Sequence, residues 1–540
     1  MQKKQFQQNM KDKVRVFEDG GIRLLKRGQK GVVHAIFSRF GLVLVLLLLQ
    51  AFALFSLLQW FGGLLPHYFG GTLLVTAAMM VYLLNQDMDN SVRITWLVVT
   101  ALMPVLGVPL FWYTKADIGH NALKKRLMDL ESQTRAQLPQ PEGVEQRLEA
   151  DSPGAASLAR YLRGRGGGFP VYGNTAVTYF NGGEAKFAEL LRQLETAEHY
   201  IFLEYFIIDE GLMWGRILEV LARKAAGGVD VRVIYDDFGC VTTLPYQYYK
   251  SLQQMGIKCA AFNQFRPVLN VILNNRDHRK IAVIDGHTAF TGGINLADEY
   301  INRKERFGHW KDSGICLHGE AVWSFTVMFL QMWSTITGME CDFESYRPEI
   351  YHEEAFKKDG FVQPYGDSPL DGETVGEHVY LNIISQAKKY LYIFTPYLIP
   401  DNETLTALCM AAKRGVDVRI VTPGIPDKKI VYILTQANYE ILLESGVQIY
   451  QYTPGFIHSK SFVCDDEVAT VGTINMDYRS MYLHFECGVW MYGSSAVAQV
   501  KEDALITFEQ CEQINMDYCR KKNFAVRALR GALKFLAPLL

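Results

Sequence analysis

The longest hydrophobic stretch of the chain lies near its N-terminus. Residues 40–86 include no Asp, Glu, Lys or Arg, and residues 41–65 alone are long enough to cross a hydrocarbon core of about 30 Å as a helix. Shorter apolar runs follow at 68–84 and 94–114, and the last contains two prolines that can kink a helix or make it re-entrant. We therefore predict a multi-pass transmembrane region over residues 40–114, with two or three apolar segments.

Beyond this region the pattern changes to alternating strands and helices. Residues 115–169 are polar and predict a helical connector. Further on, the sequence Gly-Val-Asp-Val-Arg occurs at 228–232 and again at 415–419, each time after a strand-like run and a helical pattern. Strand, helix and strand at this spacing predict a βαβ unit with a parallel sheet.

This repeat divides the body of the chain into two α/β halves. We place the halves at 170–350 and 377–540, joined by an acidic, proline-containing linker at 351–376. The expected fold class is therefore α/β, with a duplicated body that follows an N-terminal transmembrane helical region.

Charge is unevenly distributed along the chain. The formal net charge is −2, but residues 1–40 carry ten Lys or Arg against three acidic residues, so the remainder is net acidic. A basic N-terminal segment, 1–39, is typical of the cytoplasmic side of a membrane. A second positive flank at 115–126 favours the same side for the body, which we expect to be cytoplasmic. The acidic body argues against a nucleic-acid partner.

The nine cysteines indicate a reducing compartment. They are scattered, they form no Cys-x-x-Cys pair, and no Cys/His cluster has the spacing of a zinc site. Such a set is more typical of free thiols than of a disulfide framework. We expect no bound metal and no other cofactor.

One chemical motif occurs twice, with Lys, Asp, Gly and Asn at 2, 7, 14 and 17 residues after a His. The first copy is His278, Lys280, Asp285, Gly292 and Asn295. The second copy is His458, Lys460, Asp465, Gly472 and Asn475. At ordinary residue frequencies one such set arises by chance roughly once in tens of millions of positions, so a purely structural origin of both is untenable.

The residue types in this motif suit a phosphate. Residues two apart in a strand share a face, so each His points to the same side as its Lys. Glycine permits close backbone approach, and Asn adds an amide donor. Two such half-sites predict phosphoryl transfer without a metal, in which one neutral imidazole attacks phosphorus and the other exchanges protons with the leaving and incoming alcohols. Asp285 and Asp465 have an equally good interpretation as hairpin-turn residues.

The paired His-x-Lys motifs with their downstream Asp resemble the signature of the phospholipase D superfamily. Residues 202–208, 292–295 and 394–397, together with the proline-containing membrane run, resemble bacterial cardiolipin synthases. The resemblance covers nearly the whole chain. It implies a phospholipase D-type α/β/α body with two mixed-sheet halves, located in a bacterial cell membrane with phosphatidylglycerol and other anionic lipids as partners. It also implies the joining of two phosphatidylglycerols into cardiolipin with release of glycerol.

The resemblance assigns roles to individual residues. His278 resembles the nucleophile and His458 the general acid/base. Lys280, Lys460, Asn295 and Asn475 match phosphate-binding positions, with Gly292 and Gly472 beside them. An acidic residue downstream orients each histidine in the family, and Asp312 takes that place in the first half and Glu486 in the second. Thr473 stands where the first half has Gly293, a difference that we expect to matter little.

Two further features have ordinary explanations. Four other histidines near the motifs, His287, His309, His318 and His484, have no paired counterpart and are expected at the surface or in the core. The tail from Arg520 to Leu540 carries six basic residues and a leucine stripe. It predicts either a docked terminal helix or a basic amphipathic helix on anionic lipid.

Three function classes remain open from the sequence. The first is a membrane phosphatidyltransferase. The second is a hydrolase of the same superfamily, a phospholipase or a nuclease, in which water attacks the same intermediate. The third is an inactive membrane scaffold, which two intact motifs disfavour. The sequence does not define the oligomeric state.

Overall fold

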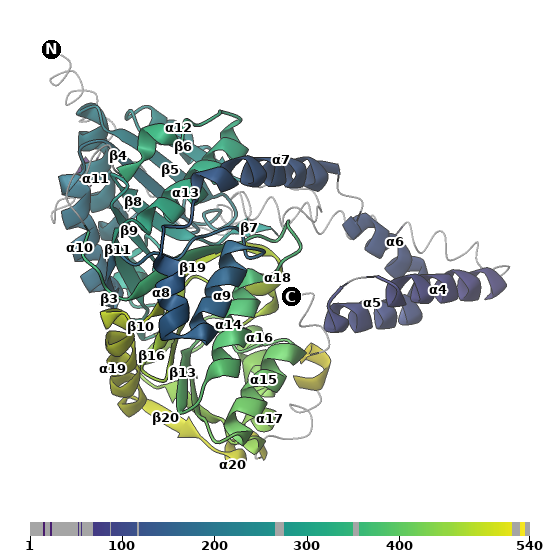
Figure 1. Cartoon of the computed structure of the whole chain (residues 1–540). Coiled ribbons are helices and arrows are strands. Elements are labelled where there is room, and N and C mark those ends of the chain that lie inside the picture. The colour runs from purple at the N-terminus through teal and green to yellow at the C-terminus, as the bar shows by residue number, and fades with distance from the viewer. Residues whose placement is uncertain are drawn as a thin grey trace.

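The computed structural model describes mainly residues 69–86, 88–115, 118–264, 275–348, 356–520 and 530–534. Nearer the N-terminus it describes two short paired strands, β1 (Arg15–Val16) and β2 (Ile22–Arg23). Two mixed sheets with helices packed against them form the body, and three helices project from it as an arm (Figure 1). The expected α/β body with two mixed sheets is confirmed.

The first sheet has seven strands in the order β3-β11-β9-β8-β4-β5-β6. Their bounds are β3 (Thr175–Phe180), β4 (Tyr200–Tyr205), β5 (Asp230–Asp236), β6 (Lys258–Phe262), β8 (Lys280–Ile284), β9 (Thr288–Gly292) and β11 (Gly314–Gly319). The neighbours β4, β5 and β6 run parallel, and the other pairs are antiparallel. Strands β4 and β8 are buried along their whole length, which explains their almost uninterrupted apolar sequences.

The second sheet has the order β12-β19-β18-β17-β13-β14-β15-β20, with β7 beside β19. Its strands are β7 (Arg276–Asp277), β12 (Phe361–Asp367), β13 (Tyr390–Phe394), β14 (Asp417–Pro423), β15 (Gln448–Tyr452), β17 (Ser461–Cys464), β18 (Val468–Gly472), β19 (His484–Tyr492) and β20 (Cys511–Ile514). From β12 to β15 it repeats the strand order and directions of the first sheet. The two sheets are thus two copies of one arrangement.

The second sheet begins earlier than the boundary at residue 377 that the sequence suggests. Its edge strand β12 lies inside the segment 351–376, where a linker was expected, and pairs along its length with β19. The acidic and proline residues of this segment concealed a strand whose Pro364 sits at the sheet edge, where a missing N–H is tolerated.

Helices connect the strands and cover the sheets. They are α10 (Gly183–Thr196), α11 (Leu212–Ala226), α12 (Tyr248–Gln253), α13 (Val322–Thr337), α14 (Val375–Gln386), α15 (Asn402–Lys413), α16 (Lys429–Ala437), α17 (Tyr439–Glu444), α18 (Tyr478–Tyr482), α19 (Ser495–Glu509) and α20 (Met516–Arg520), with single 3-10 turns η4 (Asp298–Ile301) and η5 (Glu344–Tyr346). Helix α13 is buried over almost its whole length and contacts strands of both sheets, which explains why its sequence contains no charged residue.

The connector expected at 115–169 is helical and packs against the body. It contains α7 (Ile118–Thr134), η2 (Arg135–Gln137), α8 (Val144–Asp151) and α9 (Pro153–Arg163). Leu148, Ala156 and Leu162 are completely buried in the larger hydrophobic core. At the start of α9, the Ser152 side chain accepts a hydrogen bond from the backbone N–H of Ala155, as is typical of an N-cap residue.

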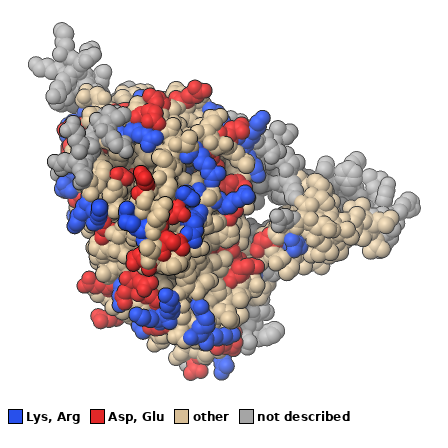
Figure 2. All heavy atoms as spheres, viewed as in Figure 1, with Lys and Arg blue, Asp and Glu red and all other residues tan. Residues whose placement is uncertain are grey.

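The arm contains the described part of the predicted transmembrane region. It consists of α4 (Phe69–Leu84), α5 (Asn90–Leu102) and α6 (Pro104–Lys115), and Figure 2 shows it nearly free of charged side chains. The apolar run 94–114 is divided at Met103, because Pro104 starts a new helix. Of the helices that the structure describes, none is both long and apolar enough to cross a membrane. The run 41–65 lies almost wholly outside the described residues.

The described part of the C-terminal tail, residues 530–534, is helical and touches the body. Arg530 is buried and donates a hydrogen bond to Gln436 Oε1 at 2.7 Å, and Leu533 packs against Leu434. These contacts favour the docked helix over a helix lying free on lipid. Three other basic positions of the tail, Lys521, Lys522 and Arg527, lie outside the described residues.

Candidate active site

Two short strand pairs join the halves where the motifs meet. Strand β7, which leads into His278, runs parallel to the start of β19, and β16 (Gly455–Ile457), which leads into His458, runs parallel to β10 (His309–Lys311). The backbone N–H of His278 donates to the carbonyl of Phe485, and that of His458 to the carbonyl of Lys311. Each motif histidine is therefore fixed by a strand of the opposite half.

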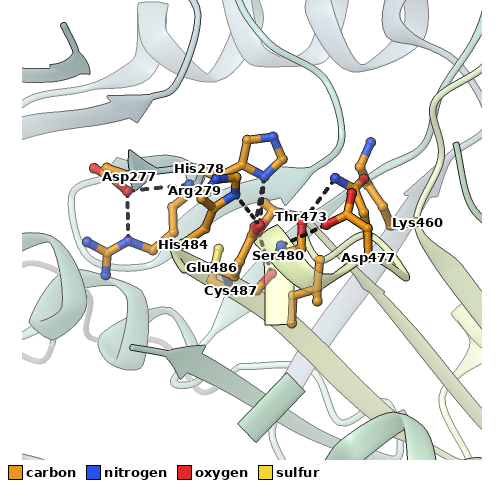
Figure 3. Close-up of polar contacts among 12 residues, drawn as sticks. Asp277, His278, Arg279, Lys460, Thr473, Asp477, Ser480, His484, Glu486 and Cys487 are labelled. Atoms are coloured by element: carbon orange, nitrogen blue, oxygen red, sulfur yellow. Dashed lines mark hydrogen bonds and ion pairs between the residues drawn. The ribbon is translucent and has the colours of Figure 1, made fainter. Parts of the chain in front are cut away.

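The orienting acids are exchanged between the halves. His278 Nδ1 lies 2.8 Å from Glu486 Oε1, and His458 Nδ1 lies 2.7 Å from Asp312 Oδ2 (Figure 3 shows the first pair). Asp312 thus serves the histidine of the second half, and Glu486 that of the first. Both acids that the sequence singled out lie beside a motif histidine, but the sequence gave no sign of this exchange, because it arises from strand pairing across the interface.

The site is removed from water. His278 and His458 are each 7 % exposed, while Asp312 and Glu486 are not exposed at all. Burial lowers the pKa of His278 to about 3 and that of His458 to about 4, although the neighbouring carboxylates oppose this. The pKa of Asp312 stays below its ordinary value, because His458 and hydrogen bonds outweigh the cost of burying it. Both imidazoles are therefore neutral at neutral pH, and each has a carboxylate on Nδ1 that leaves Nε2 for chemistry.

Three lysines supply positive charge around the histidines. Lys280 and Lys460 are buried, and each ammonium donates to the backbone carbonyl of its own motif histidine. Burial lowers the pKa of Lys280 to about 8 and that of Lys460 to about 7. Lys186 on α10 is a residue that the sequence did not reveal: its buried ammonium has no hydrogen-bond partner among the described residues, and burial lowers its pKa to about 8.

The two asparagines occupy equivalent positions. Asn295 Nδ2 donates to the hydroxyl of Tyr300, and Asn475 Nδ2 donates to the hydroxyl of Ser480, five residues on in each case. Each amide keeps a second N–H for a ligand. Asn295 Oδ1 also accepts from the backbone N–H of Ile207, which fixes its orientation.

The motif aspartates hold the fold rather than line the site. Asp285 adopts a positive φ of 47° and accepts hydrogen bonds from three successive backbone N–H groups, those of Glu198, His199 and Tyr200. Asp465, at φ 55°, does the same for residues 388–390. This geometry favours the turn interpretation, because both carboxylate oxygens are occupied at the start of a central strand.

The glycines serve close backbone approach, as expected. A Cβ on Gly292 would collide with the backbone of Ser313, and one on Gly472 with the backbone of Cys487. The next position breaks the symmetry. At Gly293 a Cβ would collide with the Asp312 carboxylate, whereas the hydroxyl of Thr473 donates to Glu486. The exchange of glycine for threonine is therefore not neutral, since each residue fits the acid beside it.

His484 is the functional candidate that the sequence missed. It is buried on β19, its ring centroid lies 5.4 Å from that of His278, and its Nδ1 lies 3.5 Å from Glu486 Oε1. The signal was the spacing, because His484 and Glu486 are two residues apart in a strand and so share a face. The other three histidines lie away from the site. His309 bonds Tyr452, and His287 and His318 contact each other beside Thr288.

Two mixed sheets that bring two His-Lys half-sites together define a phospholipase D-like protein. Comparison with known proteins gives the same class. The family described as "Cardiolipin synthase, PLD-like domain" matches residues 190–333 and 380–505, and a cardiolipin synthase of Alkalihalophilus pseudofirmus is 34% identical over 497 residues, 90% of this chain and 97% of the relative. The chain therefore belongs to the cardiolipin synthase family of phospholipase D-like proteins.

Two other matches add detail. An uncharacterized protein of Streptococcus mutans is 48% identical over 461 residues, which cover 85% of this chain and 99% of the relative. The crystal structure of a phosphatidylserine synthase from Haemophilus influenzae superposes with a TM-score of 0.52 at 14% identity, covering 71% of this chain and all of that one. At that identity, the superposition bears on the fold alone.

Proposed function

We propose that the protein is a cardiolipin synthase, which transfers a phosphatidyl group from one phosphatidylglycerol to another and releases glycerol. The observation that carries the proposal is the meeting of two His-Lys half-sites across the halves, each histidine paired with an acid of the other half. Family membership over most of the chain supplies the substrate class, a phospholipid.

In the first step, Nε2 of His278 attacks the phosphorus of one phosphatidylglycerol. A P–N bond forms, the P–O bond to the terminal glycerol breaks, and His458 gives a proton to the leaving oxygen. Glu486 on Nδ1 stabilises the positive charge that develops on His278, as a carboxylate does for a catalytic imidazole. His458 must be protonated for this step, and the anionic phosphate favours that form by adding a negative charge nearby.

In the second step, a hydroxyl of the second phosphatidylglycerol attacks the phosphohistidine. Neutral His458 accepts the hydroxyl proton, the P–N bond breaks and cardiolipin is formed. Asp312 holds His458 in the tautomer that serves both steps, through the bond to Nδ1. His458 thus acts as the general acid in the first step and as the general base in the second, which a covalent intermediate makes possible.

In both steps, the nonbridging oxygens of the substrate phosphate need nearby positive charge and N–H donors. Lys280 and Lys460 retain ammonium donors beyond those given to the histidine carbonyls, and Asn295 and Asn475 each retain one amide N–H. These groups are fixed before the substrate arrives, which is the condition for strong electrostatic stabilisation. The mechanism requires no cofactor.

The competing function is hydrolysis, since water can attack the same phosphohistidine. The decisive experiment incubates the purified full-length protein with phosphatidylglycerol in detergent micelles and resolves the lipid products. Cardiolipin with equimolar glycerol is expected. Phosphatidic acid as the main product, at all substrate concentrations, would assign the protein as a phospholipase D-type hydrolase instead.

We further propose that residues 40–114 anchor the protein in the bacterial cell membrane as a multi-pass region, with the body on the cytoplasmic side. Support comes from the uncharged run 40–86 and from the exposed leucines of α4, such as Leu73 and Leu74. Extraction of membranes with alkaline carbonate should leave the full-length protein in the pellet. Its release into the supernatant would contradict the anchor.

A further inference from the structure

The proposed mechanism leaves the buried imidazole of His484 unexplained. This side chain is 9 % exposed, its Nε2 has no hydrogen-bond partner in the part of the chain that the structure describes, and its Nδ1 has only the long 3.5 Å contact with Glu486 Oε1. A buried polar atom without a partner is costly, so the unpaired Nε2 of this imidazole indicates a ligand.

His484 lies in a cluster of three groups that can bind a metal ion. His278, His484 and Glu486 can each offer one ligand atom, and these atoms all lie within 4.8 Å of one another. Figure 3 shows the two imidazoles on the same side of the Glu486 carboxylate. The ligands of a tetrahedral zinc ion are about 3.3 Å apart, given bonds of about 2.0–2.1 Å, so small side-chain rotations would bring the three atoms to bonding distance.

The ligand set selects the kind of ion. Two imidazoles and one carboxylate suit Zn²⁺ and similar transition-metal cations, and three protein ligands leave a fourth position open. Ca²⁺ and Mg²⁺ prefer sites made of oxygen ligands and would bind here weakly.

Around His458, the described residues form no such cluster. The position equivalent to His484 in the strand pairing is Trp310, because Trp310 pairs with Phe456 as His484 pairs with Arg276. The Trp310 ring lies 5.5 Å from His458, close to the 5.4 Å between His484 and His278, but indole offers no lone pair to a metal. The third ligand is therefore a feature of one half and not part of the duplicated phosphate chemistry.

We propose that His278, His484 and Glu486 form a binding site for a divalent transition-metal cation, with Zn²⁺ as the best match, and that the bound ion inhibits the enzyme. The ion would compete with the hydrogen bond between His278 and Glu486 and would take both groups out of the transfer reaction. The geometry of the three side chains supports metal binding by itself, whereas inhibition also rests on the proposed function.

The binding test needs no lipid. Purified full-length protein is titrated with Zn²⁺ against a chromophoric chelator, and with Co²⁺ while its visible absorption is recorded. One ion per chain is expected, with the band intensity of a four-coordinate Co²⁺ site. His484→Asn should lose at least about 10-fold in affinity, since one of three ligands is gone. His318→Asn, which changes a histidine outside the cluster, is the control and should bind like the parent.

Thermal melts of each variant, together with His484→Gln, separate loss of a ligand from loss of the fold. A parent protein that binds no Zn²⁺, or binds it equally well in folded His484→Asn, would overturn the proposal. In the activity test, each variant is compared with its own rate without metal, and Zn²⁺ should inhibit the parent at least about 10-fold more strongly than His484→Asn. Equal inhibition of the two would overturn it as well. Because the Co²⁺ spectrum does not depend on turnover, failure of the proposed function would show separately, as binding without phosphatidyl transfer.

Discussion

The half-site around His278 and the half-site around His458 share a backbone but differ in the side chains that complete it. In both, a histidine donates its backbone N–H to the opposite half, a lysine donates to the histidine carbonyl, and an asparagine donates to a hydroxyl five residues on. The differences lie in the acid and its neighbours. Glu486 accompanies Thr473 and His484, whereas Asp312 accompanies Gly293 and Trp310.

The length of the acidic side chain explains these differences, because it determines which neighbouring residue fits beside the carboxylate. Glutamate is one methylene longer than aspartate, yet both carboxylates reach Nδ1 of a histidine at nearly the same distance, 2.8 and 2.7 Å. The second half fills the place beside Glu486 with the Thr473 hydroxyl, while the first half keeps Gly293 so that Asp312 fits. Duplication thus preserved the geometry at the histidine and allowed its surroundings to diverge.

The largest expected effect comes from the histidines themselves. His278→Ala and His458→Ala should each reduce turnover by at least about 10³-fold, because in the proposed mechanism one removes the nucleophile and the other the proton carrier. With a phosphodiester that has a good leaving group, only His458→Ala should accumulate a covalent adduct, seen by mass spectrometry of the intact protein. An adduct in His278→Ala but not in His458→Ala would reverse the two roles.

The exchanged acids give the next largest effect. Glu486→Gln and Asp312→Asn should each lower turnover by about 10²–10⁴-fold, because the amide no longer stabilises an imidazolium. Single-turnover experiments separate the two variants: Glu486→Gln should slow adduct formation even with a good leaving group, whereas Asp312→Asn should slow it only with a poor one. If each acid served the histidine of its own half, this pattern would be inverted.

Gly293 and Thr473 test whether the two surroundings are interchangeable. Gly293→Ala should lower turnover more than Thr473→Gly, because the new Cβ displaces the Asp312 carboxylate, whereas loss of the Thr473 hydroxyl removes one hydrogen bond worth about 1.5–3 kcal/mol to a charged acceptor. Turnover rates of both variants show which substitution costs more activity, and melting curves establish that both variants are folded. Equal rates in the parent and in Gly293→Ala would show that the Asp312 carboxylate does not need the space that Gly293 leaves.

The lysines predict how phosphate binding responds to pH. Burial lowers the pKa of Lys460 to about 7 and of Lys280 to about 8, so both ammonium groups lose their protons as the pH rises through this range. Affinity for dimethyl phosphate, a phosphodiester whose single negative charge is constant over this range, should fall several-fold between pH 6.5 and 9 as positive charge is lost, and calorimetry measures it. In Lys460→Met the fall should start at higher pH. A pH-independent affinity in the parent would show that the lysines keep their charge.

The smallest effect on chemistry is expected from the motif aspartates. Asp285→Ala and Asp465→Ala each remove an acceptor of three backbone N–H groups, at a cost of about 2–4 kcal/mol in the free energy of unfolding. Both should lower the melting temperature by similar amounts while leaving the rate per folded molecule nearly unchanged. If Asp285→Ala folds well but has lost most of its activity, Asp285 takes part in catalysis directly.

The sequence predicted both half-sites because their spacing is repeated along the chain. It did not reveal which acid meets which histidine, since that depends on β7 pairing with β19 and β10 with β16, contacts between distant segments that carry no local pattern. His484 has no histidine counterpart in the first half, so the repeat does not mark it, although its alternation with Glu486 indicates a shared face. The β12 strand was hidden by acidic and proline residues that an edge strand tolerates.

The crosswise pairing also has a consequence for how the chain is made. Glu486 follows His278 by 208 residues. A ribosome that adds about 5–20 residues per second therefore leaves His278 without its acid for about 10–40 s. Late in this interval the first half has been synthesised with its lysine and imidazole, but without the carboxylate that pairs with the imidazole. In the proposed mechanism, the nascent chain therefore lacks a complete active site until translation has passed Glu486, close to the end of the chain.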